Sequence, residues 1–144
     1  MKKIIATLIA LFICLPTFAG QIGTVDYKKV IENYSKAKSA ISQIQDRELE
    51  LQRYILDKEK ELKKIESPIQ KKSYGDTIAK EFAKKEQAYI TFRIQKEEAV
   101  DKEIMNAIKQ VAIENKLDSV VDYSAVFFGG VDITDKVIRK LNLK

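Results

Sequence analysis

The sequence predicts a mainly α-helical protein with a small β body, in which a long antiparallel coiled-coil hairpin of two helices stands on a small α/β oligomerisation body. Three observations predict this fold class. The 144 residues are 33% charged and include only five glycines and two prolines. Apolar residues recur at alternating spacings of three and four through the first half of the chain. Short β-like segments flank the two long helical stretches.

The residues that the chain lacks exclude most catalytic chemistry. There is no histidine, so no imidazole can act as a base near neutral pH or bind a metal ion. Cys14 is the only cysteine, so one chain forms neither a disulfide nor a cysteine-based zinc site. Composition leaves a carboxylate- or lysine-based enzyme open. Our prediction is that the protein is not an enzyme and has no catalytic, cofactor-binding or metal-binding residue.

Residues 1–19 have the three-part layout of a secretory signal peptide. Lys2 and Lys3 supply a positive start, and thirteen mostly apolar residues follow. Thr17 and Ala19 occupy the −3 and −1 positions of a cleavage site after Ala19. A membrane anchor is disfavoured, because thirteen residues are too few to span about 30 Å as a helix. A lipoprotein is disfavoured, because Cys14 follows bulky apolar residues.

Cleavage after Ala19 leaves a mature chain of 125 residues with 24 basic and 21 acidic residues, a net charge of +3. This mature chain contains no cysteine, so it needs no disulfide in an oxidising compartment. We therefore predict export to the periplasm of a bacterium with two membranes.

The first half of the mature chain predicts one short strand and one long helix. Residues 21–25 are β-like, and Asp26 is a good N-cap for a helix that begins at Tyr27. No glycine or proline interrupts the chain from there to Glu66. The seam of this helix is apolar at ten of twelve positions, with Glu48 and Lys58 as the exceptions. The twelve positions are 27, 30, 34, 37, 41, 44, 48, 51, 55, 58, 62 and 65.

The chain reversal between the two helices is predicted within residues 66–76. Ser67, Pro68 and Gln70 resemble an N-cap, a first-turn proline and a capping-box partner. Gly75 followed by an aspartate is a second candidate break. A second, less regular helix is expected to run to about Asn115. The helical hairpin therefore comprises residues 27–115, and the two matched helices return the chain to its starting end.

The remaining residues predict the small body, formed by 20–26 together with 116–144. Ser119–Asp122 and Ala125–Phe128 are expected to be short strands, with the pair of glycines at 129 and 130 as a turn. Asp132 or Thr134 is expected to cap a final helix that runs from residue 135 to about residue 142.

Such a body is too small to bury much core by itself, which favours self-association. Association would cover the edges of the sheet and the apolar face of the last helix. The physical argument predicts an oligomer but gives no subunit number. The candidate oligomerisation residues are Ile22, Val25, Val120, Val121, Val126, Phe127, Ile133, Val137 and Leu141.

Both ends of the mature chain resemble the Skp/OmpH family of periplasmic chaperones. The resemblance rests on "IGTVDYKKVIENYSKAK" near the start and above all on the tail "LDSVVDYSAVFFGGVDITDKVIRKLN", in which Asp118–Val126 is the most specific part. It implies a jellyfish-like homotrimer whose hairpins surround a cavity for unfolded outer-membrane β-barrel proteins, without ATP. Residues 127–130 are more apolar than this resemblance leads us to expect.

The distal half of the hairpin is basic. Residues 58–85 contain nine lysines and five acidic residues, a net charge of +4. Diffuse electrostatics would attract acidic clients, anionic lipid or lipopolysaccharide, whereas an ordinary solvated helix face is the simpler interpretation. Two tyrosines off the main seam are candidates for an inner, client-facing wall. The candidate client- or membrane-binding residues are Lys60, Lys63, Lys64, Lys71, Lys72, Tyr54 and Tyr74.

Three functions compete at this point. The leading hypothesis is an ATP-independent holdase; the alternatives are a periplasmic coiled-coil scaffold or spacer, and a peripheral membrane-binding protein. Neither the paired glycines nor the carboxylates of Asp118 and Asp122 make a specific catalytic or phosphate-binding motif. Export away from the cytoplasm also argues against nucleic acid as a partner.

Overall fold

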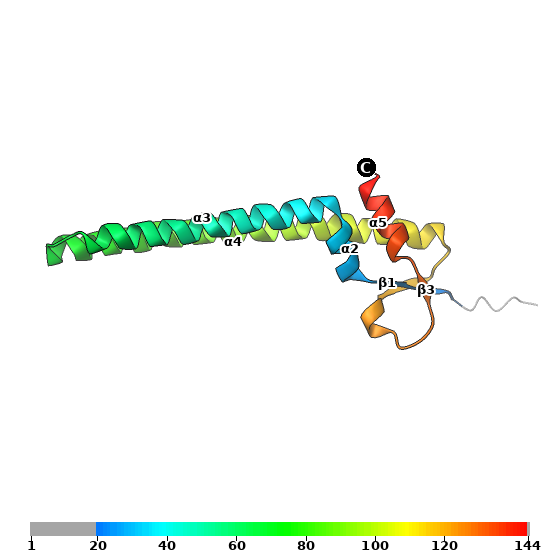
Figure 1. The fold of residues 1–144 in the computed structure, drawn as a ribbon. Coiled ribbons are helices and arrows are strands. Elements are labelled where there is room, and N and C mark those ends of the chain that lie inside the picture. Colours follow the sequence, from blue (N-terminus) through cyan, green and yellow to red (C-terminus); the bar gives the residue numbers. More distant parts are fainter. Residues whose placement is uncertain (1–19, 144) are drawn as a thin grey trace, which may run out of the picture.

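The computed structural model describes residues 20–143, so the predicted signal peptide lies outside the described residues. Figure 1 shows a long helical hairpin that projects to one side of a small body containing both the first strand and the last helix. The chain leaves the body along α2 (Tyr27–Asn33) and α3 (Ser35–Lys63) and returns along α4 (Pro68–Glu114). The 47 residues of α4 span about 70 Å at 1.5 Å per residue.

The first helical segment is broken at Tyr34, and the predicted uninterrupted helix is wrong on this point. Asp26 caps α2 as expected, because its Oδ1 accepts a hydrogen bond from the backbone N–H of Lys29 at 2.8 Å. Tyr34 then adopts an extended conformation, with φ −91° and ψ 118°. Its ring is only 1% exposed. The break therefore places a large aromatic side chain in the core.

The reversal at the hairpin tip occupies residues 64–67, between the end of α3 and the start of α4. Ser67 stands at the N-cap position and Pro68 at the first helical position, although no side-chain hydrogen bond caps the helix. Gly75, the second candidate break, lies within α4. The turn therefore begins two residues before the predicted range, and α4 ends at Glu114 against a predicted end near residue 115.

Three parallel strands form the sheet, in the order β2–β1–β3. The central strand β1 (Ile22–Val25) pairs with β2 (Ser119–Asp122), and Gly23 lies opposite Val120. The third strand, β3, is Val131–Asp132, so the predicted strand at 125–128 is wrong. A short 3-10 turn at Tyr123–Ala125 replaces the first residue of that predicted strand.

Two glycines carry the chain into β3. Gly129 and Gly130 have φ of +87° and +94°, in the region that disfavours side chains with a Cβ. A Cβ at Gly130 would also lie 2.7 Å from Cγ2 of Thr24. The two glycines therefore precede the third strand, whereas the predicted turn was to follow it, and the chain bends one step earlier, at residues 127 and 128.

The last helix, α5 (Thr134–Asn142), begins in a short hydrogen-bonded chain. The hydroxyl of Thr134 accepts from the backbone N–H of Asp26 at 2.9 Å and donates to Asp132 Oδ1 at 2.6 Å. Asp132 Oδ1 also accepts from the Thr134 N–H at 2.8 Å. Residues more than a hundred positions apart are thus joined where both α2 and α5 begin.

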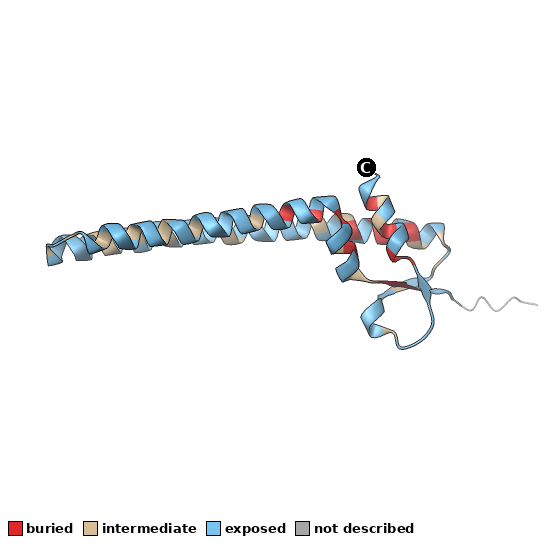
Figure 2. Ribbon diagram, in the orientation of Figure 1, coloured by how far each residue is buried: buried red, intermediate tan, exposed pale blue. Residues whose placement is uncertain are grey.

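The core lies where the body meets the base of the hairpin, and Figure 2 shows the buried residues gathered there. The apolar face of α5 packs against α2 and α4 in its own chain, so the expectation that self-association covers this face is wrong. Val25, Ile133, Val137 and Leu141 are all buried. Val120 and Val126 are half-buried. Ile22, Val121 and Phe127 are 50%, 37% and 108% exposed.

Candidate functional site

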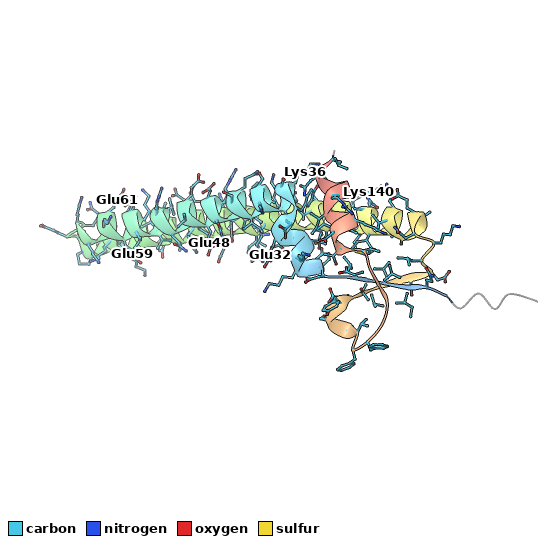
Figure 3. The ribbon with its side chains drawn as sticks, turned by 45° about the vertical axis from the view of Figure 1, so that its right-hand side comes forward. Glu32, Lys36, Glu48, Glu59, Glu61 and Lys140 are labelled. Carbon is cyan, nitrogen blue, oxygen red and sulfur yellow. The ribbon has the colours of Figure 1, made fainter. Side chains whose placement is uncertain are left out.

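The hairpin is a two-helix layer with both faces open to solvent. Ala40 on α3 and Ile104 on α4 are the last buried residues on the way to the tip. Among the described residues between them, every side chain is half-buried or exposed. Figure 3 shows side chains projecting outward along the whole hairpin, with Glu59 and Glu61 toward its end. The hairpin therefore offers a large surface for contacts with other molecules.

The five candidate lysines near the tip are all exposed. Lys60 forms an ion pair with Asp57 at 3.2 Å on its own helix. The other four make no ion pair or side-chain hydrogen bond with any residue that the structure describes; they are Lys63, Lys64, Lys71 and Lys72. Four of the tip's cations are thus available to external anions.

The two candidate tyrosines connect the two helices through their hydroxyls. Tyr54 on α3 donates a hydrogen bond from its hydroxyl to Glu81 on α4 at 2.5 Å. Tyr74 on α4 donates to Glu61 on α3, which also pairs with Lys58 at 2.8 Å. Both rings are half-buried. Their hydroxyls therefore hold the hairpin together, and only part of each ring is left exposed.

Charge is organised around these tyrosines. Hydrogen bonding to Glu81 raises the pKa of the Tyr54 hydroxyl. The hydrogen bond from Lys58, and then that from Tyr74, lowers the pKa of Glu61. Lys58 is one of the two charged exceptions in the predicted apolar seam. Its half-buried position in this cluster explains why a lysine is tolerated there.

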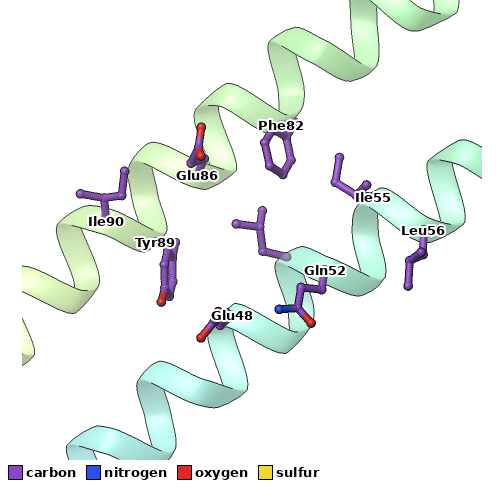
Figure 4. Close-up of a pocket in the computed structure, with 9 residues that line it drawn as sticks. Glu48, Gln52, Ile55, Leu56, Phe82, Glu86, Tyr89 and Ile90 are labelled. Atoms are coloured by element: carbon purple, nitrogen blue, oxygen red, sulfur yellow. The ribbon is translucent and has the colours of Figure 1, made fainter.

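The other seam exception, Glu48, lies at a groove between the two helices, midway along the hairpin. The groove has a volume of about 550 Å³. Figure 4 shows the rings of Phe82 and Tyr89 pointing from α4 toward α3 and Glu48 lying opposite Tyr89. Nine residues line it: Glu48, Leu51, Gln52, Ile55, Leu56, Phe82, Glu86, Tyr89 and Ile90. We call this set the mid-hairpin groove.

The groove was not predicted as a site, although the sequence carried a signal for it. A charged residue at a seam position cannot fill the space that an apolar knob would occupy between two helices. The side chain of Glu48 is exposed, and the apolar residues around it are left only partly covered. Leu56 is 55% exposed. An interruption of the seam thus marks the point where apolar surface becomes accessible.

Cations cover the aromatic rings beside this groove. Arg47 stands 4.9 Å from the centre of the Phe92 ring, and Lys96 stands 5.3 Å from the same ring. Lys85 lies 4.9 Å from the centre of the Tyr54 ring. These contacts are cation–π interactions, which shield the rings from other partners. A smaller cavity of about 220 Å³ lies among these cations, with Arg47 and Lys85 in its lining.

The structure presents no metal or membrane-spanning element within the part of the chain it describes. Residues 20–143 include no group of three or more histidine, cysteine, aspartate or glutamate side chains that could hold a metal ion. No helix in the same range combines the length and apolar character needed to cross a membrane.

This fold and surface define a class of protein in which a long, solvent-exposed helical hairpin projects from a small α/β body. Residues 21–141 match the family model described as outer membrane protein (OmpH-like). The chain therefore belongs to this family, the Skp/OmpH family that its tail resembles.

A solved structure agrees with the fold. The crystal structure described as that of an OmpH-like outer membrane chaperone from Caulobacter crescentus superimposes with a TM-score of 0.53 and 15% sequence identity. The match covers 86% of this chain and 85% of the other. At this identity the likeness concerns the fold alone. A search of curated protein sequences finds no match.

Proposed function

We propose that this protein is a periplasmic, ATP-independent holdase that binds unfolded outer-membrane β-barrel proteins between helical hairpins and prevents their aggregation. The observation that supports this proposal is the hairpin itself, which has accessible apolar surface at the mid-hairpin groove and free cations near its tip. A holdase needs many weak, dispersed contacts instead of one deep pocket, and contacts on linked arms add up. Membership of the Skp/OmpH family, which the resemblance of the sequence links to periplasmic chaperones, supports this function.

The arms are brought together by self-association of the body into a homotrimer. Both β2 and β3 are edge strands, so each presents unpaired backbone groups to a partner. Apolar side chains near these edges are exposed: Phe127 and Phe128 are 108% and 98% exposed, and Tyr123 is 60% exposed. Burying such rings between subunits would remove a costly apolar surface from water. Three copies would surround a cavity between their hairpins.

Aggregation suppression combined with mass determination tests this proposal. The mature chain, residues 20–144, is mixed with a urea-denatured outer-membrane β-barrel protein on dilution, and light scattering follows aggregation. We expect suppression at close to one trimer per client without nucleotide, and a trimeric mass by multi-angle light scattering. A periplasmic scaffold or spacer would leave aggregation unchanged, and that result would overturn the holdase assignment.

A second function, peripheral membrane binding, is favoured by the four unpaired lysines at the tip. Each basic side chain near an anionic bilayer contributes about 1 kcal/mol of attraction. Flotation with vesicles that contain anionic lipid or lipopolysaccharide, compared with neutral vesicles, measures this directly. Association only with the anionic vesicles, lost at high salt, is the expected result for membrane delivery by the tips. Absence of flotation would leave client binding as the sole role of these lysines.

A further inference from the structure

The mid-hairpin groove combines an apolar floor with an acidic edge. Seven of its nine lining residues carry no charge, and the remaining two, Glu48 and Glu86, are carboxylates; none is basic. Glu48 comes from α3 and Glu86 from α4, so each helix contributes one of these carboxylates (Figure 4). The groove thus differs in charge from the tip of the same hairpin, where lysines predominate.

Both carboxylates are free to take an external partner. Glu48 and Glu86 are exposed, and neither carboxylate forms an ion pair or hydrogen bond with a residue in the described range. Two other hairpin glutamates, by contrast, are engaged: Glu61 pairs with Lys58 at 2.8 Å, and Glu97 lies 3.8 Å from Arg93. Arg47 and Lys85, which neighbour these glutamates in the sequence, stand over aromatic rings and do not line the groove.

We infer that the mid-hairpin groove binds extended segments of unfolded protein in which an aromatic or large aliphatic side chain is flanked by lysine or arginine. The inference rests on the proposed function and names the segment that this groove selects. The apolar side chain would fill the space beside Leu51, Phe82 and Tyr89. The flanking cations would reach the carboxylates of Glu48 and Glu86, since charge complementarity of this kind sets which partner binds.

The segments that the mid-hairpin groove would bind differ from those that the basic tip would bind. Basic tips attract acidic segments, and acidic-edged grooves hold apolar segments with neighbouring cations. One client chain carries both kinds of segment, so the two surfaces can hold the same chain at different points. Weak contacts at each surface then sum to a useful affinity across several hairpins.

The test uses the whole mature protein and three synthetic, fluorescently labelled twelve-residue peptides. The first has a central Phe-Leu pair with two lysines on each side; the second replaces the lysines with glutamates; the third replaces Phe-Leu with Ala-Ala. Binding is measured by fluorescence anisotropy for the wild-type chain and for a Glu48→Gln, Glu86→Gln variant. A Glu59→Gln, Glu98→Gln variant serves as the matched control, because it makes the same charge change at exposed residues outside the groove.

We expect the groove variant to weaken binding of the lysine-flanked peptide by about three- to tenfold, the scale of two exposed ion pairs. The affinity of this variant for the glutamate-flanked peptide should be unchanged, since that peptide would bind the tip lysines. The control variant should bind all peptides like the wild type. The Ala-Ala peptide should bind the wild type more weakly than its Phe-Leu parent.

Two results would overturn the inference. One is unchanged binding of the lysine-flanked peptide to the groove variant, or an equal loss in the control variant. The other is equal binding of the Ala-Ala and Phe-Leu peptides to the wild type. If the wild-type chain still suppresses aggregation of the β-barrel client in those cases, the holdase function stands and only the groove assignment fails. Loss of suppression by the wild type itself overturns the proposed function instead.

Discussion

Asn142, at the end of α5, holds the N-terminus of α3 through Ser35, which lies 107 positions earlier. Asn142 Oδ1 accepts hydrogen bonds from the backbone N–H of Ser35 at 3.0 Å and from its hydroxyl at 2.9 Å. Asn142 Nδ2 donates to the carbonyl of Asn33, the last residue of α2, at 2.9 Å. One side-chain amide therefore caps both helices at the break around Tyr34, where no local side chain does so.

Asn142→Ala should destabilise the fold by about 1 kcal/mol, the usual cost of removing a helix cap. Urea unfolding followed by circular dichroism measures this loss as a lower midpoint with an unchanged slope. Asn106→Ala is the matched control, since Asn106 is exposed on α4. An equal midpoint for both variants would show that the break at Tyr34 does not depend on α5.

The same contact explains why the break was not predicted. Local sequence favours a continuous helix, because residues 27–66 lack glycine and proline and Tyr34 occupies a seam position. The features that interrupt this helix are tertiary. Asn142 of α5 caps the start of α3, and the side chain of Tyr34 packs into the core. Periodicity reports which residues are apolar. It cannot report a cap that arrives from another part of the chain.

Asp132 should make the fold sensitive to acid. Hydrogen bonds from the Thr134 hydroxyl and then from its N–H lower the pKa of Asp132. Because the folded-state pKa lies below the unfolded value of about 3.9, this stabilisation is present above that pH. It is lost as the pH falls through the folded-state pKa. Asp132→Asn should therefore be less stable than the wild type at pH 7, by about 0.5–1 kcal/mol.

The gap in unfolding midpoint between Asp132→Asn and the wild type should narrow as the pH falls below about 4, because the unfolded state takes up a proton on Asp132 first and the folded state does so only at lower pH. Urea titrations at pH 7, 5, 4 and 3 follow this gap. Asp46→Asn, at an exposed position on α3, supplies the control for the loss of one negative charge. A gap that stays constant down to pH 3 would mean that the Asp132 carboxylate is not what stabilises the start of α5.

Charge reversal at the tip should weaken binding without affecting assembly. The change replaces Lys63, Lys64, Lys71 and Lys72 with glutamate, at positions with no ion pair to break among the described residues. Binding to anionic vesicles or acidic clients should fall at least about tenfold at low salt, given about 1 kcal/mol per basic residue. The difference should shrink at 1 M salt, where the screening length is about 3 Å.

A control for the tip uses four exposed lysines near the base of the hairpin. They are Lys28, Lys38, Lys102 and Lys109. Their reversal changes the net charge equally, so it separates a local effect of the tip from the total charge. Dissociation of the tip variant into monomers by light scattering would contradict the role assigned to these lysines, since they lie far from the body.

The candidate site was predictable in part. Charge counting along the chain found the basic tip, and the seam positions flagged Glu48 and Lys58 as exceptions. The hydrogen bonds of Tyr54 and Tyr74 across the hairpin could not be foreseen, because their partners Glu81 and Glu61 lie on the opposite helix. Which residues of α3 and α4 lie opposite each other depends on the exact position of the turn between them. A turn at 64–67 sets that register, whereas the predicted range of 66–76 leaves it open.

Glu48→Leu should stabilise the hairpin and impair client binding together. Leucine at this seam position would fill part of the groove and bury apolar surface worth about 1 kcal/mol, less than a fully buried side chain gains. The midpoint temperature of thermal unfolding should therefore rise while suppression of client aggregation declines, which is a trade-off between stability and function. Glu59→Leu, at an exposed position outside the seam, should change neither measurement. A stabilised variant with full activity would show that clients do not use the groove.

The double substitution Phe127→Ser, Phe128→Ser should dissociate the assembly while each chain stays folded. Both rings are essentially fully exposed within one chain, at 108% and 98%, so the monomer loses no core contact when they are removed. In an oligomer that buries them, each lost ring removes a contribution on the scale of about 1.5–3 kcal/mol. Light scattering should report a monomer at concentrations where we expect the proposed trimer of the wild type. The circular dichroism spectrum should be unchanged.

Ile69→Ser provides the control, because Ile69 is 83% exposed near the hairpin tip, away from the body. An unchanged mass for the double variant would mean that the chains associate through a surface other than the loop between β2 and β3.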